Sequence, residues 1–357
     1  MSQFDFIDLC AGIGGLRIPF ESRKKENILW GDIPGKCVWT SEMDDDACSV
    51  YAKNFSSDNK SEKDVFEEIN RDFTIYPPEE VPDHQLLLAG FPCQPFSQAG
   101  KRRGRTDERG RVFDSIEHII AAKKPKVVLL ENVKGLRSLR NPQPDETFVL
   151  DEILLALARP RRKDGTRPRG LSYFVPKPVV LNARDFGLAQ NRQRLFILAI
   201  RQDIADSKGL NIDGKFTWPE PTFDRNTLKI SKFLDEEVDE TYTISEKLWE
   251  SHKRRKEKNK ASGKGFGYQA FKPSDTYVST ISARYFKDGA EALILQDGMP
   301  PRKLTPREGA NLQGFPVNFV LHASKMKAFK QLGNAVPVPV VSAIARNIWN
   351  LGILTRD

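Results

Sequence analysis

The chain has 357 residues, 39% hydrophobic and 29% charged, which is enough to bury a sizeable core. Its 56 Lys and Arg residues exceed its 48 Asp and Glu residues, so the formal net charge of +8 points to a polyanionic partner, nucleic acid first. The start, MSQFDFIDLC, is acidic where a signal peptide needs positive charge, and no window approaches the ~18 apolar residues of a membrane span. We therefore expect a cytoplasmic protein with no membrane partner.

Residues 1 to about 200 alternate short apolar runs with helix-like segments, which is typical of an α/β fold with a doubly wound sheet. The clearest predicted strands read FDFIDLCAG, CVWTSE, HQLLLAGFP, KVVLLENV and RLFILAIR. Ligands of open α/β sheets bind beyond the carboxyl ends of the strands, so the residues after these runs are the candidates for chemistry.

Past residue 200 the chain turns to loops and short elements rich in Pro, Gly and Lys, which predicts a second, smaller domain. Near its end, Thr305, Pro306 and Glu308 carry the N-cap, first-turn and capping-box signals of a short helix that stops at Gly314. The segment QLGNAVPVPVVSAIARNIWNL is apolar enough to form a buried helix. We place the first domain at 1–200, completed by 326–357, and the second at 201–325.

A glycine turn, DLCAGIGGLR, follows the first predicted strand and is expected to open a helix. Its glycines let a ligand approach the backbone with no Cβ in the way. A dinucleotide fingerprint needs a third glycine where Arg17 stands, which disfavours a hydride-transfer enzyme. Glu42, at the end of the next strand, could accept hydrogen bonds from a ribose diol, and Asp64 could accept from an adenine amine. A purely structural turn is the alternative.

Four chemically distinctive residues flank three of the predicted strands. Cys93 lies between two prolines after LLLAGF, Glu131 follows KVVLL, and Arg192 and Arg194 precede LFILAI at a spacing that puts both on one side of an extended chain. If the strands are parallel neighbours, a thiol, a carboxyl and two guanidinium groups meet on one rim. Each also has a plainer interpretation: a core thiol, a helix cap or solvated arginines. The four cysteines lack zinc-site spacing, so no metal is predicted.

At this point the motifs show a resemblance. GFPCQPFS, ENVKG, QNRQR and RKLTPREGANLQGFP, with DLCAGIGG before them and QLGNAVPVPV after, resemble in order and spacing the DNA (cytosine-5)-methyltransferases of bacterial restriction-modification systems. The resemblance implies a Rossmann-like methyltransferase domain that uses S-adenosylmethionine and a smaller, mostly irregular or β target-recognition domain. It also implies double-stranded DNA as the partner, in the bacterial nucleoid, and a monomer suffices for this chemistry.

The resemblance also assigns roles to residues. Cys93 would be the nucleophile that adds to C6 of cytosine, Glu131 would contact N3 and the exocyclic amine, and Arg192 with Arg194 would steady the base. The donor-binding residues implied are Cys10, Gly12, Gly14, Gly15, Glu42, Met43, Asp64, Val65, Pro92, Asn334 and Val336. Cys10 and Met43 depart from the family, which commonly has aromatic residues at both places, so donor affinity is expected to be weaker than typical.

Because C6 is inaccessible inside a duplex, the resemblance implies that the target cytosine is rotated out. The DNA-binding residues implied are Gln94, Ser97, Gln98, Lys101, Arg102, Arg103, Arg105, Lys264, Phe266, Tyr268 and Thr280. The stretch GKGFGYQAF with VSTISARYFKDGAEALI resembles the recognition region of enzymes that modify CCGG or CC-x-GG sites. The basic run 253–264 is expected to contact phosphates, whereas ARPRRKDGTRPRG at 158–170 has no implied role and is expected to be a solvated loop.

Two other functions stay open beside DNA cytosine-5 methylation. One is cytosine-5 methylation of tRNA, although RNA-specific families usually employ a second cysteine that has no matching motif here. The other is a DNA-binding regulator that has kept the fold and lost catalysis, against which the intact Cys93, Glu131 and Arg192 argue.

Overall fold

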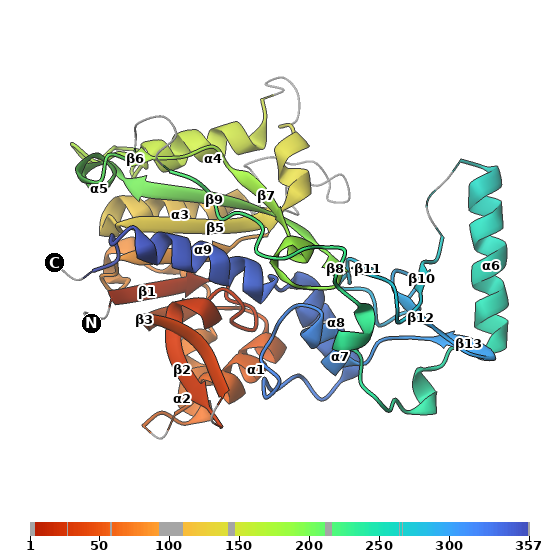
Figure 1. The fold of residues 1–357 in the computed structure, drawn as a ribbon. Coiled ribbons are helices and arrows are strands. Elements are labelled where there is room, and N and C mark those ends of the chain that lie inside the picture. The colour runs from red at the N-terminus through yellow and green to blue at the C-terminus, as the bar shows by residue number, and fades with distance from the viewer. Residues whose placement is uncertain are drawn as a thin grey trace. The chain divides into compact units, whose positions relative to one another are not determined.

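The computed structural model describes residues 4–26, 28–57, 59–92, 110–141, 147–210, 216–263, 265 and 267–355 (Figure 1). It divides into two compact units. Unit 1 comprises Met1–Leu181, Gln193–Pro219 and Val341–Asp357, and unit 2 comprises Asn182–Arg192 and Glu220–Val340. Unlike the predicted domains, unit 2 includes 182–192 and 326–340, because these segments pair or pack with its other elements. Which stretch selects the target sequence stays a prediction.

One eight-stranded sheet organises unit 1, in the order β2-β3-β1-β4-β5-β9-β6, with β7 paired to β9. Its strands are β1 (Phe4–Leu9), β2 (Glu21–Lys25), β3 (Ile28–Ser41), β4 (Leu86–Gly90), β5 (Val127–Val133), β6 (Tyr173–Phe174), β7 (Val179–Asn182) and β9 (Gln193–Arg201). Pairing is parallel from β3 through β1 and β4 to β5, and antiparallel where β9 joins β5. All five predicted strands are confirmed.

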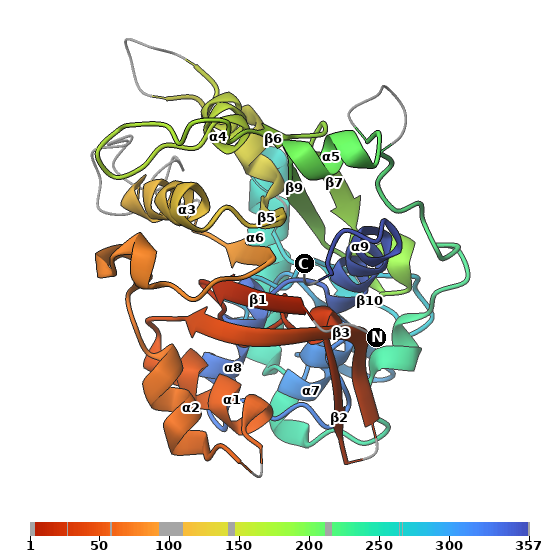
Figure 2. The ribbon, with the colours of Figure 1, turned by 90° about the vertical axis from the view of Figure 1, so that its left-hand side faces the viewer.

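Helices cover both faces of this sheet, as the doubly wound class requires (Figures 1 and 2). They are α1 (Asp45–Phe55), α2 (Glu62–Ile69), α3 (Gly110–Lys123), α4 (Val149–Ala158), α5 (Gln202–Ser207) and α9 (Val338–Asn350). Buried residues of α3 and α4, such as Ile116 and Ile153, share one apolar core with Ile7 and Leu87 of the strands. On the opposite face the Trp349 ring of α9 lies 6.0 Å from the Phe4 ring.

The helix expected after the glycine turn is not an α-helix. The turn leads into one short 3-10 helix, η1 (Ile18–Phe20), and the chain then continues as the antiparallel hairpin of β2 and β3. Pro19 sits at the start of η1, and Phe20 is completely buried, so the segment packs as a corner of the core. The glycine pattern therefore predicts the turn correctly but does not predict the 3-10 helix and hairpin that follow it.

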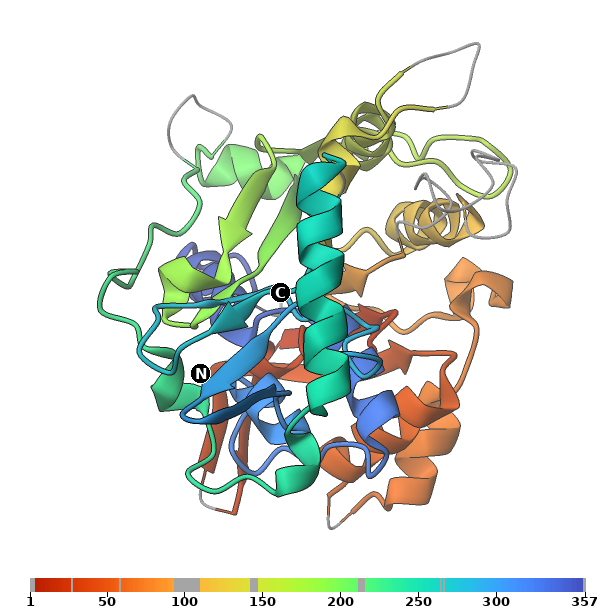
Figure 3. The same ribbon diagram turned by 90° about the vertical axis from the view of Figure 1, so that its right-hand side faces the viewer.

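The described part of unit 2 contains short strands, three α-helices and short 3-10 helices. The strands are β8 (Gln190–Asn191), β10 (Ala270–Phe271), β11 (Val278–Ser279), β12 (Leu293–Gln296) and β13 (Met299–Arg302). The helices are α6 (Glu246–Ala261), α7 (Pro306–Asn311) and α8 (Lys325–Asn334). Figure 3 shows α6 along its length, in contact with β13. The predicted capping box of Thr305 and Glu308 at the start of α7 is confirmed, and Gly314 ends the turn after it at φ +74°.

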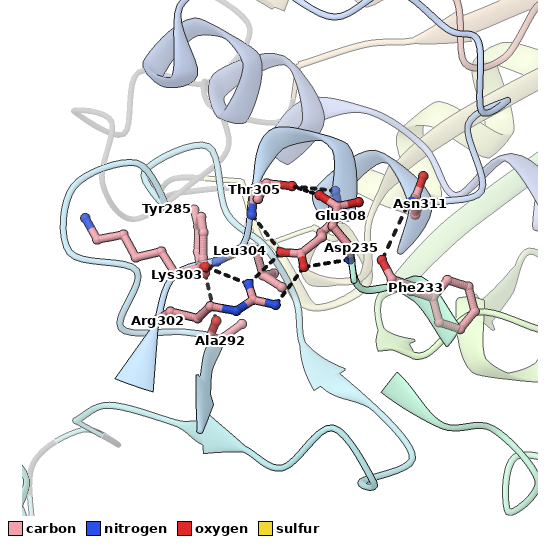
Figure 4. Close-up of polar contacts among 10 residues, drawn as sticks. All are labelled: Phe233, Asp235, Tyr285, Ala292, Arg302, Lys303, Leu304, Thr305, Glu308 and Asn311. Carbon is pink, nitrogen blue, oxygen red and sulfur yellow. Dashed lines mark hydrogen bonds and ion pairs between the residues drawn. The ribbon is translucent and has the colours of Figure 1, made fainter. Parts of the chain in front are cut away.

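A buried carboxylate holds the strand β13, the start of α7 and a distant loop together (Figure 4). Glu308 is fully buried, and both of its oxygens accept from the Arg302 guanidinium, at 2.7 and 2.8 Å. It also accepts from the backbone N–H groups of Thr305 at 2.8 Å and Asp235 at 3.0 Å. A buried charge with four donors is well compensated, whereas Arg302 alone would be a costly buried cation.

We predict that Glu308→Ala lowers the free energy of unfolding by about 3–5 kcal/mol, because it leaves a buried guanidinium without its partner. Urea unfolding followed by circular dichroism measures the loss. The control is Glu250→Ala, which removes a half-exposed carboxylate paired with Lys253 on α6 and should cost less than about 1 kcal/mol. Equal losses in the two variants would contradict the role given to the buried pair.

Candidate active site

Glu131 and Arg194 form a buried ion pair at the carboxyl end of β5. Arg194 Nε lies 2.9 Å from Glu131 Oε1, and the two side chains are only 10% and 9% exposed. The predicted rim assumed parallel strands, and this was wrong for β9. Because β9 runs antiparallel to β5, its amino end lies beside the carboxyl end of β5, with Arg194 opposite Val133. A parallel strand would have put Arg194 at the other edge of the sheet.

The same edge holds the start of the segment that carries the cysteine. Gly90, the last residue of β4, is the register partner of Glu131, and a Cβ placed on it would lie 3.6 Å from Glu131 Oε2. Asn132 Nδ2 donates to the Phe91 carbonyl at 3.0 Å, which ties the exit of β4 to β5. Pro92 follows and is exposed. The predicted residues between Cys93 and Arg105 lie outside the described residues.

Arg192 has partners of a different kind from those of Arg194. Its side chain is completely buried in unit 2, where it donates to the backbone carbonyls of Ile281 at 3.1 Å, Gly333 at 2.7 Å and Ala335 at 2.5 Å. Strand pairing is interrupted at this residue, between β8 and β9, so the period-two argument from an extended chain does not apply. Arg192 thus cross-links three segments of unit 2, and its contact with the base stays a prediction.

Left-handed backbone shapes the turn that follows β1. Cys10, Gly12 and Gly14 have φ values of 53°, 57° and 85°. At Gly14 a Cβ would come within 2.4 Å of the Phe55 ring on α1, so only glycine fits there. At Gly12 a Cβ would meet nothing within 4 Å, so the backbone faces open space, as a ligand cradle requires. Cys10 adopts the same region without being glycine, which is uncommon and marks local strain.

Glu42 is fixed against this turn. Its Oε2 accepts from the Gly12 backbone N–H at 2.8 Å, and its Oε1 accepts from the N–H groups of Met43 and Asp44 at 2.8 and 2.9 Å. A carboxylate offers about four acceptor sites, so one more remains for a ligand hydroxyl. Met43 is 65% exposed beside it. The glycine turn and the acid are therefore one unit, assembled at the carboxyl ends of β1 and β3.

Asp64 and Asp72 occupy different places relative to that unit. Asp64 is exposed and closes a capping box with Ser61 at the start of α2, while Val65 is buried behind it. Asp72 follows the segment that pairs with Glu42, because the Arg71 N–H donates to the Glu42 carbonyl at 3.1 Å. Burial raises the pKa of the Cys10 thiol, and the charges of Glu42, Asp8 and Asp72 raise it further. Asp72 likewise caps a short helix, since its Oδ1 accepts from the Thr74 N–H at 2.9 Å and the Thr74 hydroxyl at 2.7 Å. The adenine contact of Asp64 stays a prediction.

Comparison with known proteins shows the family of the chain. A family model described as C-5 cytosine-specific DNA methylase matches residues 4–350. The chain belongs to that family. The type II methyltransferase M.NlaX of Neisseria lactamica is 42% identical over 346 residues, which cover 97% of this chain and 96% of the relative. M.DsaV of Dactylococcopsis salina is 41% identical over 99% of this chain and 88% of its own, and M.HpaII of Haemophilus parainfluenzae is 35% identical over 97% and 89%.

Solved structures share the fold of this methylase. The Entamoeba histolytica methyltransferase EhMeth aligns with a TM-score of 0.71 at 19% identity, over 98% of this chain and 99% of that one. The Dnmt2 methyltransferase of S. pombe aligns with a TM-score of 0.68 at 18% identity, over 98% and 99%. At these identities the likeness shows the fold alone, and it confirms the predicted α/β methyltransferase architecture.

The remaining predicted residues of the methylase lie in unit 2. Asn334 ends α8, and Val336 is buried two residues later. Tyr268 packs its ring 4.7 Å from that of Trp249 on α6, and Thr280 Oγ1 donates to the Asn191 carbonyl at 2.5 Å. Lys264 and Phe266 lie outside the described residues. The contacts of these six with donor or DNA stay predictions.

Neither a metal site nor a membrane-spanning helix is present among the described residues. In that part of the chain no group of three or more His, Cys, Asp and Glu residues is arranged to hold a metal ion. The helices there include none that is both long and apolar enough to cross a membrane.

Arg17 explains why the third glycine of a dinucleotide fingerprint is missing. Its guanidinium forms an ion pair with Glu21, with Nε 2.5 Å from Oε2, and donates to the Tyr51 hydroxyl at 2.7 Å. Its Cζ lies 4.2 Å from the centre of the Phe55 ring. A large side chain therefore fills the position where the fingerprint needs a close helix contact, which supports the exclusion of a dehydrogenase.

Asp8 is the unusual group beneath the turn. It lies in β1 two residues before Cys10, is completely buried, and neither carboxyl oxygen has a hydrogen-bond partner among the described residues. Burial raises the pKa of Asp8 to about 8; the positive charge of Arg17 opposes this rise and the negative charge of Glu42 adds to it. The carboxyl is therefore neutral in the folded protein over most of the physiological range.

This burial predicts a pH-dependent stability. In the unfolded chain Asp8 ionises near its ordinary pKa of about 4, so the unfolded state releases a proton that the folded state keeps up to a pKa of about 8. The contribution of Asp8 to stability therefore falls as the pH rises from about 4 to about 8 and is constant above that. Asp8→Asn should remove this loss and stabilise the protein by a few kcal/mol at pH 8.

Urea unfolding at pH 5, 7 and 9 measures the difference between Asp8→Asn and the wild type, which should grow with pH. Glu62→Gln, at an exposed position in the first turn of α2, is the control for loss of one carboxyl. A difference that is the same at all three pH values would show that Asp8 is not held neutral by burial.

Proposed function

We propose that this methylase transfers a methyl group from S-adenosylmethionine to C5 of a cytosine rotated out of a short, specific site in duplex DNA. In this proposal it protects DNA in a restriction-modification system, as the type II names of its relatives suggest. The observation that carries the proposal is the buried Glu131–Arg194 pair beside Gly90, three residues before Cys93.

The residues at this edge suit an attack on C6 of cytosine. C5 is a poor nucleophile, so the Cys93 thiolate first bonds to C6 and the ring electrons move toward N3 and C5. C5 would then take the methyl group as the bond from that carbon to the donor's sulfonium sulfur breaks and its electron pair stays on sulfur; a base would take the proton from C5, and the thiolate would leave C6. Glu131 meets the charge that develops at N3 and the exocyclic amine, since Oε1 is held by Arg194 while Oε2 faces Gly90.

The glycine turn and Glu42 suit the donor. The open backbone at Gly12 gives room for a nucleoside, and the remaining acceptor site of Glu42 fits a ribose hydroxyl. Asp64 and Asp72 each use one carboxyl oxygen in a helix cap, and Asp72 is the second candidate acceptor for the adenine amine because it follows the segment paired with Glu42. When bound there, S-adenosylmethionine supplies an electrophilic methyl group.

Unit 2 offers a cationic surface for the DNA backbone. Helix α6 carries Lys247, Arg254 and Lys258 at spacings of seven and four residues, which align on one face of the helix. Its other face packs on Tyr268 through Trp249 and Lys256, so that face is occupied. Cations in this arrangement contact phosphates and add affinity without reading sequence.

Trapping on a modified base tests the nucleophile. DNA that contains 5-fluorocytosine has no proton to lose from C5, so the cysteine should stay bonded to C6 after methyl transfer. With S-adenosylmethionine present, the wild type should form a protein–DNA adduct stable in denaturing gels, and Cys93→Ser should form none. Cys37→Ser, which changes a thiol 3.2 Å from Thr40 Oγ1, is the control and should trap DNA as the wild type does.

Adduct formation by Cys93→Ser, or a product methylated on the exocyclic nitrogen, would overturn this chemistry. Genomic DNA and tRNA offered in parallel to the wild type decide the substrate, and methyl transfer to tRNA alone would favour the RNA alternative.

Calorimetric titration with S-adenosylmethionine tests the donor site. Glu42→Ala and Asp72→Ala should each weaken binding by about 10–100-fold, because a hydrogen bond to a charged acceptor contributes about 1.5–3 kcal/mol. Asp64→Ala is the comparison, and it should bind the donor as the wild type does if the residue that follows the segment paired with Glu42 is the acceptor. Loss of affinity in Asp64→Ala, with none in Asp72→Ala, would restore Asp64 as the adenine acceptor.

A further inference from the structure

The basic insertion at 158–170 is a structured loop between α4 and β6. Twelve of its residues, 159–170, read RPRRKDGTRPRG, and the exposed cations are Arg159, Arg162, Lys163, Arg167 and Arg169. The acid of this stretch, Asp164, is used within the loop, because its Oδ1 accepts from the Thr166 N–H at 2.8 Å and the Thr166 hydroxyl at 2.7 Å. The bonds from Thr166, and to a smaller extent the charge of Arg162, lower the pKa of this carboxyl, so Asp164 stays ionised and offsets one of the five exposed positive charges.

Glu117 of α3 anchors this loop to the core of unit 1. The Glu117 side chain is 2% exposed, and its Oε1 accepts from the Arg161 backbone N–H at 3.0 Å and from Arg161 Nε at 3.1 Å. Arg161 Nη2 donates to its other oxygen at 3.3 Å. Pro160 and Pro168 are buried on either side. Arg161 therefore holds the loop against α3, whereas the other arginines of the loop are exposed to solvent.

The tip of the loop is a closed turn. The Arg162 N–H donates to the Thr166 carbonyl at 2.8 Å, and the Gly165 N–H donates to the Arg162 carbonyl at 2.9 Å. Gly165 has a φ of +82°, which favours glycine at this point. The five cations therefore project from a fixed backbone, so they lose less conformational entropy on binding than the same cations on a loose chain.

We propose that the exposed cations of 159–169 form a phosphate-binding surface for the backbone of duplex DNA outside the target site. Five exposed cations beside one acid within eleven residues leave an excess of positive charge that repels itself, and no ion pair joins these five to an acid in the described part of the chain. A polyanion relieves that repulsion. The inference rests on the proposed function, which already brings duplex DNA to this protein.

The side chains of residues 159–170 indicate which class of polyanion this surface binds. Four of the five cations are arginines, whose planar forks match phosphate oxygens in pairs. The stretch 159–170 has no aromatic residue on which an unpaired base could stack and no Leu, Ile, Val or Met to anchor a protein partner. A duplex backbone needs neither. The loop therefore fits the phosphates of DNA better than single-stranded bases or an apolar protein surface.

The place of the loop in unit 1 separates it from the target base. The loop leads into β6, and Tyr173 of β6 pairs with Arg201, the last residue of β9. This end of β9 lies beside the start of β5. Glu131 stands near the other end of β5. The surface thus serves DNA segments away from the reacting cytosine, and we expect it to affect binding and search rather than the chemical step.

The test is the salt dependence of binding to a 30-base-pair duplex made only of A·T pairs, which contains no cytosine. The variant is Arg162→Ala with Lys163→Ala and Arg167→Ala, which keeps the Arg161 anchor. The control, Lys53→Ala with Lys60→Ala and Lys63→Ala, removes the same charge from α1, α2 and the turn between them. Fluorescence anisotropy between 50 and 300 mM KCl should show a slope of log K against log[salt] shallower by about 0.9 per lost contact in the variant, or about 2–3 in total.

The control should keep the wild-type slope, and the variant should keep the wild-type kcat on saturating plasmid DNA. Equal slopes in variant and control would overturn the surface, and so would a change seen only with duplex RNA or polyglutamate as the probe. Wild-type protein that methylates no plasmid or genomic DNA would instead refute the proposed function, which the A·T-only duplex does not test.

Discussion

The antiparallel pairing of β9 with β5 is the constraint on which the candidate active site depends. It brings the amino end of β9 to the edge where β4 and β5 end, so that Arg194 meets Glu131 at 2.9 Å in a buried setting. A carboxylate in that position is costly without a partner, and its geometry would be free to vary. The pair fixes the carboxylate beside the exit of β4, and the Asn132 side chain fixes that exit in turn.

Local signals in the sequence predicted much of the fold. The five strands can be predicted because each is a short apolar run. The capping box of Thr305 and Glu308 can be predicted because its two partners lie three residues apart. The direction of β9 cannot be predicted in this way, because strand direction depends on pairing between residues about 65 positions apart, such as Leu130 and Ile197. The sequence pattern predicts Arg194 at the edge where β4 and β5 end on the assumption of parallel strands, whereas the antiparallel pairing of β9 with β5 is what places it there.

The parts of the site that sequence reasoning missed depend on long-range contacts. Asp64 and Asp72 each cap a short helix with one carboxyl oxygen, so residue type and spacing do not decide which of them accepts from adenine. Asp72 became visible only when the segment before it paired with Glu42. Arg192 looked equivalent to Arg194, but three carbonyls from residues about 90 to 143 positions away bind it. A one-dimensional pattern reports residue types and spacing, and it does not report which partner a side chain finds.

The arginines of this chain divide into two groups with different energetics. Arg17 and Arg302 are buried in ion pairs with Glu21 and Glu308, and Arg192 is buried against backbone carbonyls, so all three stabilise the fold and none is exposed to the phosphates of a partner. Net charge counts them equally with the exposed cations of α6 and of 159–169. The attraction of a polyanion depends on the second group, because only exposed and uncompensated charge releases counterions on binding. A formal charge of +8 therefore does not locate the cationic surface, which depends on the exposed cations of α6 and of 159–169 and on the acids near them.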